Sequence, residues 1–235
     1  MIQVYSHTEA GGHAHNEDAF EVKAHPSDSS CLLCALADGQ GGRAGGARAA
    51  QLACRMCIET ASSHQPAMLA MRPEVWQAIL QRADAAVAAD AEAGFTTLIA
   101  FSIQKDAVCG ASNGDSGLFA RGAGRTGALL TEHQHKDPPI GCGGSQPVGF
   151  STQLTPPWTV LALSDGVWKY VGWDRVVKAG EQLTGKTLID SLRQQAGLPG
   201  SGCLQDDFTI VVCQNGWPSK ATYLGPPHRS LVLAG

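Results

Sequence analysis

The fold is decided by a stretch that reads CLLCALADGQGG, residues 31–42. Its first half, residues 31–37, has the length of a strand and is apolar at every position, so we expect a strand that is buried on both faces. The strand runs into Asp38-Gly39, and a glycine-rich turn follows. A buried strand can hold the Asp38 carboxylate rigidly at its end, and the glycines let a small charged group approach the backbone.

Three further acidic groups stand at the ends of predicted strands. The strand over residues 158–164 ends in Asp165-Gly166, and the strand over residues 208–213 follows directly on Asp206-Asp207. Near the start, Asn16-Glu17-Asp18 precedes a strand over residues 18–24. Carboxylates gathered in this way, with few basic residues near them in sequence, predict a site for hard divalent cations with oxygen ligands.

Composition limits the class of protein. The chain has 235 residues and is 43% hydrophobic, which is enough for one large domain with a real core. Its net charge is −4 and it has no basic run, so nucleic acid is not the expected partner. We see neither a signal peptide at the N-terminus nor an apolar run of about 20 residues. We therefore expect a cytoplasmic protein without a membrane partner.

The periodicity of apolar residues predicts helices and strands in blocks. Helices are expected over residues 45–62, 73–93, 173–182 and 187–196. Strands are expected over residues 2–8, 18–24, 31–37, 95–104, 107–113, 118–121, 128–130, 158–164 and 208–213. The polar segment 131–157, rich in proline and glycine, is expected to be a surface loop. The blocks indicate an α+β fold, in which an antiparallel β-sandwich is flanked by α-helices on both faces.

Two cysteine pairs suggest a different function. The pair Cys31 and Cys34 is separated by 19 residues from the pair Cys54 and Cys57, which matches the spacing of a zinc ribbon. However, Cys31 and Cys34 lie in a predicted strand, where residues three apart point to opposite faces. Cys54 and Cys57 lie in a predicted helix and not in a tight turn. We therefore expect all four cysteines to be small core residues, and a zinc-ribbon module remains the third hypothesis.

Taken in order, the acidic motifs resemble those of the metal-dependent protein phosphatases of type 2C, which act on phosphoserine and phosphothreonine. The resemblance covers residues 3–214 and agrees with the fold predicted above, a four-layer α-β-β-α sandwich in this family. We therefore expect a catalytic domain over residues 1–214, followed by a tail or an added edge strand over residues 215–235. The motifs that carry the resemblance are Asn16-Glu17-Asp18-Ala19, Asp38-Gly39-Gln40-Gly41-Gly42, Gly94-Phe95-Thr96-Thr97, Gly114-Asp115-Ser116, Leu163-Ser164-Asp165-Gly166-Val167-Trp168 and Asp206-Asp207-Phe208-Thr209-Ile210-Val211-Val212.

The resemblance implies a role for each acidic residue in hydrolysis by water that bridges two Mn²⁺ or Mg²⁺ ions. Asp38 would bridge both ions, and Glu17 and the carbonyl of Gly39 would bind the second. Asp165 and Asp206 would hold the first ion. Asp18 would orient the attacking water, and Asp115 with Asp165 would match a third, weaker metal position. Taken singly, each motif could be purely structural. An Asp-Gly step after a strand, as at Asp38 and Asp165, is usually a turn, and Glu17 and Asp18 could be solvated charges.

The sequence also departs from the family pattern. His13 stands where the family usually has an arginine that holds the substrate phosphate, and Arg43 is a second candidate for that contact. Gln40 stands where many members have a histidine proposed as general acid, and an amide cannot take that role. Lys169 replaces a common aspartate after Trp168. The segment between Gly114-Asp115-Ser116 and Ser164-Asp165-Gly166 is short, so the family's flap over the site must be reduced.

These features leave two hypotheses within the family. The leading one is a phosphoserine/phosphothreonine protein phosphatase whose partners are a phosphorylated protein substrate and the kinase that it opposes. The alternative is a catalytically weak regulator with the same fold that binds a phosphoprotein or a kinase. The complete acidic set favours the enzyme, whereas His13 and Gln40 favour the regulator.

Overall fold

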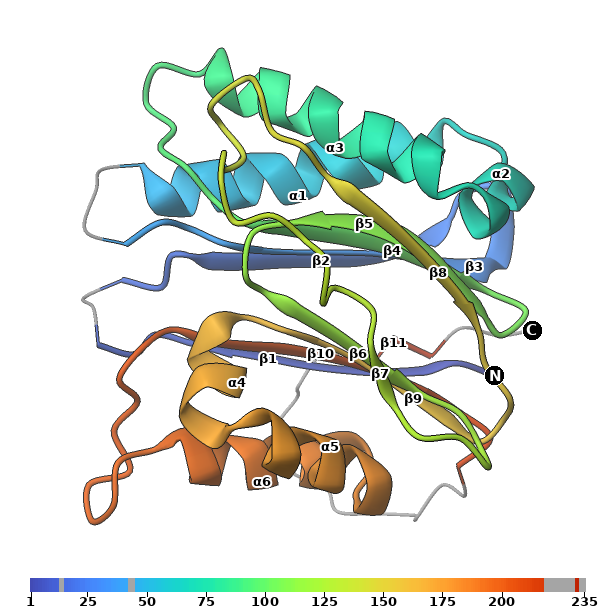
Figure 1. Cartoon of the computed structure of the whole chain (residues 1–235), viewed down its shortest axis with the longest axis vertical. Helices are drawn as coiled ribbons and strands as arrows, with labels where there is room; N and C mark the ends of the chain where they lie inside the picture. The colour runs from blue at the N-terminus through green and yellow to red at the C-terminus, as the bar shows by residue number, and fades with distance from the viewer. Residues whose placement is uncertain (13–14, 42–44, 218–230, 233–235) are drawn as a thin grey trace.

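The structure is a computed structural model that describes residues 1–12, 15–41, 45–217 and 231–232. Two antiparallel sheets lie face to face, with helices on both outer faces, as Figure 1 shows. The predicted four-layer α+β sandwich is therefore confirmed. His13 and Arg43 lie outside the described residues, as does most of the predicted tail.

The first sheet has six strands and the second has five. The order in the first is β11-β1-β10-β9-β6-β7, formed by Leu231–Val232, Gln3–Glu9, Phe208–Asn215, Trp158–Leu163, Gly117–Arg121 and Ala128–Leu129. The order in the second is β2-β3-β4-β5-β8, formed by Asp18–His25, Asp28–Asp38, Leu98–Gln104, Ala107–Asn113 and Val148–Gln153. β11 pairs with β1 at the edge of the first sheet. The domain boundary at residue 214 remains a prediction.

The helices form the outer layers. The second sheet is covered by α1 (Gly46–Ser62), α2 (Pro66–Met71) and α3 (Pro73–Ala88). The first sheet is covered by α4 (Asp165–Val171), α5 (Trp173–Gln182) and α6 (Gly185–Ala196). In the part of the chain that the structure describes, no helix has the length and apolar character needed to cross a membrane.

Strand β3 shows how the sequence creates these layers. Its residues alternate between two cores because successive side chains in a strand point to opposite faces. Cys31, Leu33, Ala35 and Ala37 pack toward the helices, and Leu32, Cys34 and Leu36 pack between the two sheets. The strand is thus buried on both faces, as its unbroken apolar run predicted, and it fixes the position of Asp38 at its end.

Several element bounds differ from the prediction. The region predicted as a surface loop over residues 131–157 contains β8, a strand with little apolar alternation that pairs with the edge of β5. The helix predicted to reach residue 93 ends at Ala88, where the Asp90 carboxylate accepts the amide of Glu92 and the guanidinium of Arg48. β4 begins at residue 98 and not 95, because Thr96 bridges Gly39 and Ile140 instead. Two short helices, α2 and α4, were not predicted.

Lys105 and Asp106 form the turn of the hairpin between β4 and β5. Both residues have positive φ values, 48° and 67°, as the two central residues of a two-residue hairpin turn require. The carboxylate of Asp106 accepts hydrogen bonds from the indole of Trp158 at 2.6 Å and the amide of Asn215 at 3.0 Å. These bonds connect the β4–β5 turn to the first sheet at the end opposite Asp38.

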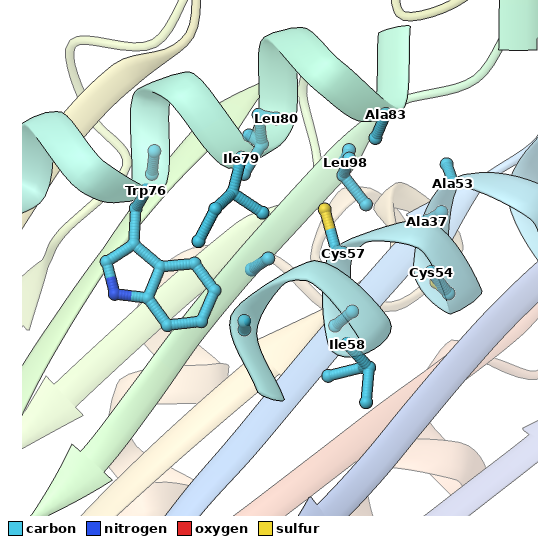
Figure 2. Close-up of a cluster of buried hydrophobic side chains, with 14 of the residues drawn as sticks. Ala37, Ala53, Cys54, Cys57, Ile58, Trp76, Ile79, Leu80, Ala83 and Leu98 are labelled. Carbon is cyan, nitrogen blue, oxygen red and sulfur yellow. The ribbon is translucent and has the colours of Figure 1, made fainter. Parts of the chain in front are cut away.

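The paired cysteines are core residues. Cys31 and Cys34 face different cores, so the two thiols cannot share one ion. Cys54 and Cys57 lie on α1 among buried side chains that face α3, as Figure 2 shows. The thiol of Cys54 donates to the carbonyl of Ala19 at 3.5 Å, and burial raises the pKa of both α1 thiols well above the ordinary value. Neutral, packed thiols are poor zinc ligands, so the geometry disfavours the zinc-ribbon hypothesis.

Replacing Cys54 and Cys57 together by alanine should therefore act through packing alone. Each change removes one buried sulfur, and we expect a loss of about 2 kcal/mol in the free energy of unfolding for the pair. Thermal unfolding would measure this loss. Cys203→Ala, at an exposed thiol, is the control and should change stability by less than about 0.5 kcal/mol. Stoichiometric zinc in the purified protein that disappears in the double variant would contradict this view.

Candidate functional site

The acidic residues predicted from the sequence, with the exception of Asp18, meet in one pocket. The pocket has a volume of about 310 Å³ and lies where the ends of β3, β5, β9 and β10 come together. Among the described residues that line it, seven are acidic and one is a lysine, Lys136. The acidic residues are Glu17, Asp38, Asp115, Asp137, Asp165, Asp206 and Asp207. Gly39 and Gln40 line it as well.

Asp38 is fixed by the two threonines that follow Phe95. Its amide donates to the Thr97 hydroxyl at 2.9 Å, and its carbonyl accepts the Thr96 hydroxyl at 2.8 Å and the Thr97 amide at 2.9 Å. Thr97 is held in turn by the hydroxyl of Ser116 at 2.8 Å. These bonds fix the backbone of Asp38 at the edge of the pocket.

Gly39 can only be glycine. A Cβ atom at this position would lie 2.5 Å from the carbonyl of Gly46 and 2.6 Å from that of Glu17. This close approach lets the Gly39 amide donate to the Glu17 carbonyl at 3.1 Å. The turn after β3 is thereby packed against the segment that carries Glu17.

Asp207 positions Glu17, a role that sequence reasoning missed. Its carboxylate is buried and accepts the amide of Gly11 at 2.9 Å and that of Glu17 at 2.6 Å. The segment before β2 is thus attached to the start of β10, about 190 residues further along the chain. The only signal in the sequence is the second aspartate of the Asp206-Asp207 pair.

Asp165 and Asp206 are brought together by another glycine. A Cβ atom at Gly166 would lie 2.0 Å from the carbonyl of Asp207, so only glycine allows α4 to begin beside β10. The hydroxyl of Ser164 joins the same two segments, because it accepts the amide of Thr209 at 3.0 Å. The two carboxylates therefore face the same part of the pocket.

Asp18 differs from the other predicted residues because it does not line the pocket. It pairs with Asp38 across β2 and β3, and its side chain is buried. Neither of its carboxylate oxygens has a hydrogen-bond partner. A buried carboxylate without partners is costly, which points to a missing positive charge or donor nearby.

The electrostatics of the site reflect this crowding. Burial, and after it the charges of Asp207 and Asp165, together raise the pKa of Asp18 to about 7. The hydroxyls of Thr209 and Ser164 lower this pKa, although neither has hydrogen-bond geometry with the carboxylate. The pKa of Asp38 is raised well above its usual value by burial first and then by Asp18, Asp165, Asp115 and Asp206. A cation in the pocket would relieve both penalties.

Two lysines already offset part of the negative charge. Lys136 donates to the Asp115 carboxylate, and Lys169 donates to Asp165 at 3.1 Å. Each of these hydrogen bonds raises the pKa of its lysine, so both side chains stay charged. As they stand, no three His, Cys, Asp or Glu side chains among the described residues form a group that could hold a metal ion.

Comparison with known proteins now identifies the family. The family model described as Protein phosphatase 2C matches residues 5–137, more than half of the chain. The chain therefore belongs to the protein phosphatase 2C family, as the motifs predicted. No curated protein sequence gives a significant match.

Solved structures show the same fold. Serine/threonine phosphatase Stp1 from Staphylococcus aureus superposes with a TM-score of 0.77 at 17% identity, over 92% of this chain and 95% of that one. The catalytic domain of the serine/threonine phosphatase PstP, in complex with two manganese ions, superposes with a TM-score of 0.73 at 21% identity, over 91% of this chain and 99% of that one. RsbX in complex with magnesium superposes with a TM-score of 0.70 at 16% identity, over 91% of this chain and 94% of that one. At these identities the likeness establishes the fold.

The raised pKa of Asp18 makes the stability of the metal-free protein depend on pH. Its pKa of about 7 in the folded protein lies above the ordinary value of 3.8, so the stabilising effect is present below about pH 4 and is lost as pH rises toward and through 7. Asp18→Asn removes this charge at nearly constant shape. We expect it to stabilise the metal-free protein at pH 8 by on the order of 3 kcal/mol, with little effect at pH 4.

Thermal unfolding of both proteins in the presence of chelator, from pH 4 to pH 8, would measure the difference. Asp190→Asn is the matched control, since Asp190 is exposed on α6 and forms an ion pair with Lys186. If the difference in stability between Asp18→Asn and the wild type did not change with pH, the raised pKa assigned to Asp18 would be contradicted.

Proposed function

We propose that this protein is a metal-dependent phosphatase that hydrolyses phosphoserine and phosphothreonine in proteins. The observation that carries the proposal is the pocket itself, where carboxylates from five separate chain segments crowd together at strand ends. A fold gains nothing from crowding like charges unless a cation or substrate uses them. Membership of the phosphatase 2C family and the manganese bound to PstP support the choice of chemistry.

The residues of the pocket fit a pair of divalent cations. Their donors are all oxygen atoms, which suit Mg²⁺ and Mn²⁺, and Asp18 supplies buried oxygens without partners. Since no three side chains among the described residues form a closed group, the protein would provide only part of each coordination shell and water the rest. Mg²⁺ usually retains several waters in this way.

The proposed ligands divide between two ions. Asp38 would hold both, with Glu17 and the Gly39 carbonyl on one side and Asp165 and Asp206 on the other. When bound, the cations lower the pKa of water and offset the charge of the transferring phosphoryl group.

The chain's own residues would set the geometry of the reaction. The threonine and serine bonds hold Asp38, and Asp207 holds the backbone of Glu17. Asp18, behind Asp38 and with a raised pKa, is suited to hold or accept a proton from water in the pocket. Gln40 lines the pocket and can donate a hydrogen bond to phosphate, but it cannot protonate the leaving group.

One observation favours the alternative of a weakly catalytic regulator. None of the described residues that line the pocket is an arginine, and Gln40 offers no general acid. Such a protein would bind a phosphorylated partner and turn it over slowly. In either case we propose a phosphoprotein as the ligand and a Ser/Thr kinase as the enzyme that produces it.

Activity should require metal and Asp38. We expect hydrolysis of a phosphoserine or phosphothreonine peptide with Mn²⁺ or Mg²⁺, and none after EDTA treatment. Asp38→Asn should reduce kcat by at least about 100-fold because it weakens the bridge between both ions. Initial rates on one phosphopeptide at fixed pH would measure this.

Asp190→Asn, the same chemical change on α6, is the control and should retain full activity. Full activity of the metal-stripped wild type would refute the proposed mechanism. Tight binding of the phosphopeptide without turnover, in the presence of metal, would select the regulator instead.

A further inference from the structure

Two lysines lie at one side of the pocket, each on an acidic residue. Lys136 donates to Asp115 and Lys169 to Asp165, and the same two carboxylates are those expected to hold a third metal ion. Lys136 also interacts with Asp165 and with Lys169 through space, so the four groups form one cluster. We call Asp115, Asp165, Lys136 and Lys169 the lysine–aspartate cluster.

The backbone places Lys136 beside Asp115. The amide of Gly114 donates to the carbonyl of His135 at 2.8 Å, so the residues that follow each of them are neighbours. The side-chain amide of Gln134 donates to the carbonyl of Ser116 at 2.7 Å, and that of Asn113 donates to the carbonyl of Pro138 at 3.0 Å. The segment that carries Lys136 is thus joined to the Asp115 loop on both sides of the ion pair.

The segment is also fixed at its far end. The carboxylate of Asp84, buried on α3, accepts the amides of Gly141 at 2.6 Å, Gly143 at 3.1 Å and Ser145 at 2.9 Å. Ile140 pairs with Thr96, one of the two threonines that hold the backbone of Asp38. This part of the reduced flap is therefore a built wall of the pocket, which keeps Lys136 in place.

Helix α4 places Lys169 beside Asp165. The two residues are one turn apart, with the acid nearer the N-terminus, which is the favourable order for such a pair. The same helix holds Asp115, because the indole of Trp168 donates to the Asp115 carbonyl at 3.0 Å. Trp168 is stacked on Trp173, with ring centroids 5.6 Å apart. Both aspartates and Lys169 thus depend on one short helix.

We propose that Lys136 and Lys169 supply the positive charge on this side of the pocket, in place of a third divalent cation. The chain would then bind two metal ions, at Asp38, and would leave Asp115 to its lysine. The inference rests on the proposed metal centre, and it replaces the metal role that the family resemblance assigned to Asp115. Each ammonium also repels an approaching divalent ion, and we expect this repulsion to lower the affinity for that ion by about tenfold.

The test is a count of bound metal. Native mass spectrometry and calorimetric titration with Mn²⁺ should find two ions on the wild type. The double variant Lys136→Met, Lys169→Met should bind a third, and each single variant should raise the affinity of that ion by about tenfold. Both lysines are exposed, at 71% and 53% of the side chain, so these variants should fold.

Two controls separate this effect from a general change of charge. Lys186→Met removes a lysine paired with Asp190 on α6, and it should leave the count at two. Adding Asp115→Asn to the double variant should remove the third ion again. Three ions on the wild type, or two on the double variant with unchanged affinities, would overturn the inference but leave the proposed function standing. An absence of bound metal from the wild type would refute the metal centre itself, and with it this inference.

Discussion

Repulsion between carboxylates at the common end of two sheets is the constraint on which this structure depends. Asp18 and Asp38 are direct neighbours across β2 and β3, and Asp165, Asp206 and Asp115 add to their electrostatic cost. Such an arrangement persists only if the surrounding fold over-determines it. The cost would fall if cations entered the pocket, so the same repulsion would provide part of the driving force for the proposed binding of metal.

The fold holds the carboxylates close together by hydrogen bonds to the backbone and by glycines, which have no side chain to collide with neighbouring segments. Glycines at positions 39 and 166 allow chain segments to approach where any Cβ atom would collide. The Asp207 carboxylate accepts hydrogen bonds from two backbone amides, those of Gly11 and Glu17. Asp207 therefore acts as a positioning residue, although it is the same residue type as its neighbour Asp206. Aspartates at this site therefore have different roles, and the hydrogen-bond partners of each aspartate determine its role.

The sequence predicted the layers from local patterns, and the order of its acidic motifs predicted most of the carboxylates that line the pocket. An apolar run of strand length such as 31–37, bounded by turn residues, favours a strand buried on both faces, and its last residue then stands at the edge of the sheet. β8 could not be predicted, since only one of its six residues is buried and it forms because β5 offers an open edge. The role of Asp207 and the pairing of Lys136 with Asp115 depend on contacts between distant segments, which no spacing in the sequence reveals.

The central claim is that the crowded carboxylates exist to hold two divalent cations bridged by Asp38. Crystals grown with Mn²⁺, and anomalous diffraction measured at the manganese edge, would test it most directly. The account predicts two strong peaks that share the Asp38 carboxylate, one beside Glu17 and the Gly39 carbonyl and the other beside Asp165 and Asp206. Peaks that do not touch Asp38, or an empty pocket at millimolar Mn²⁺, would contradict it.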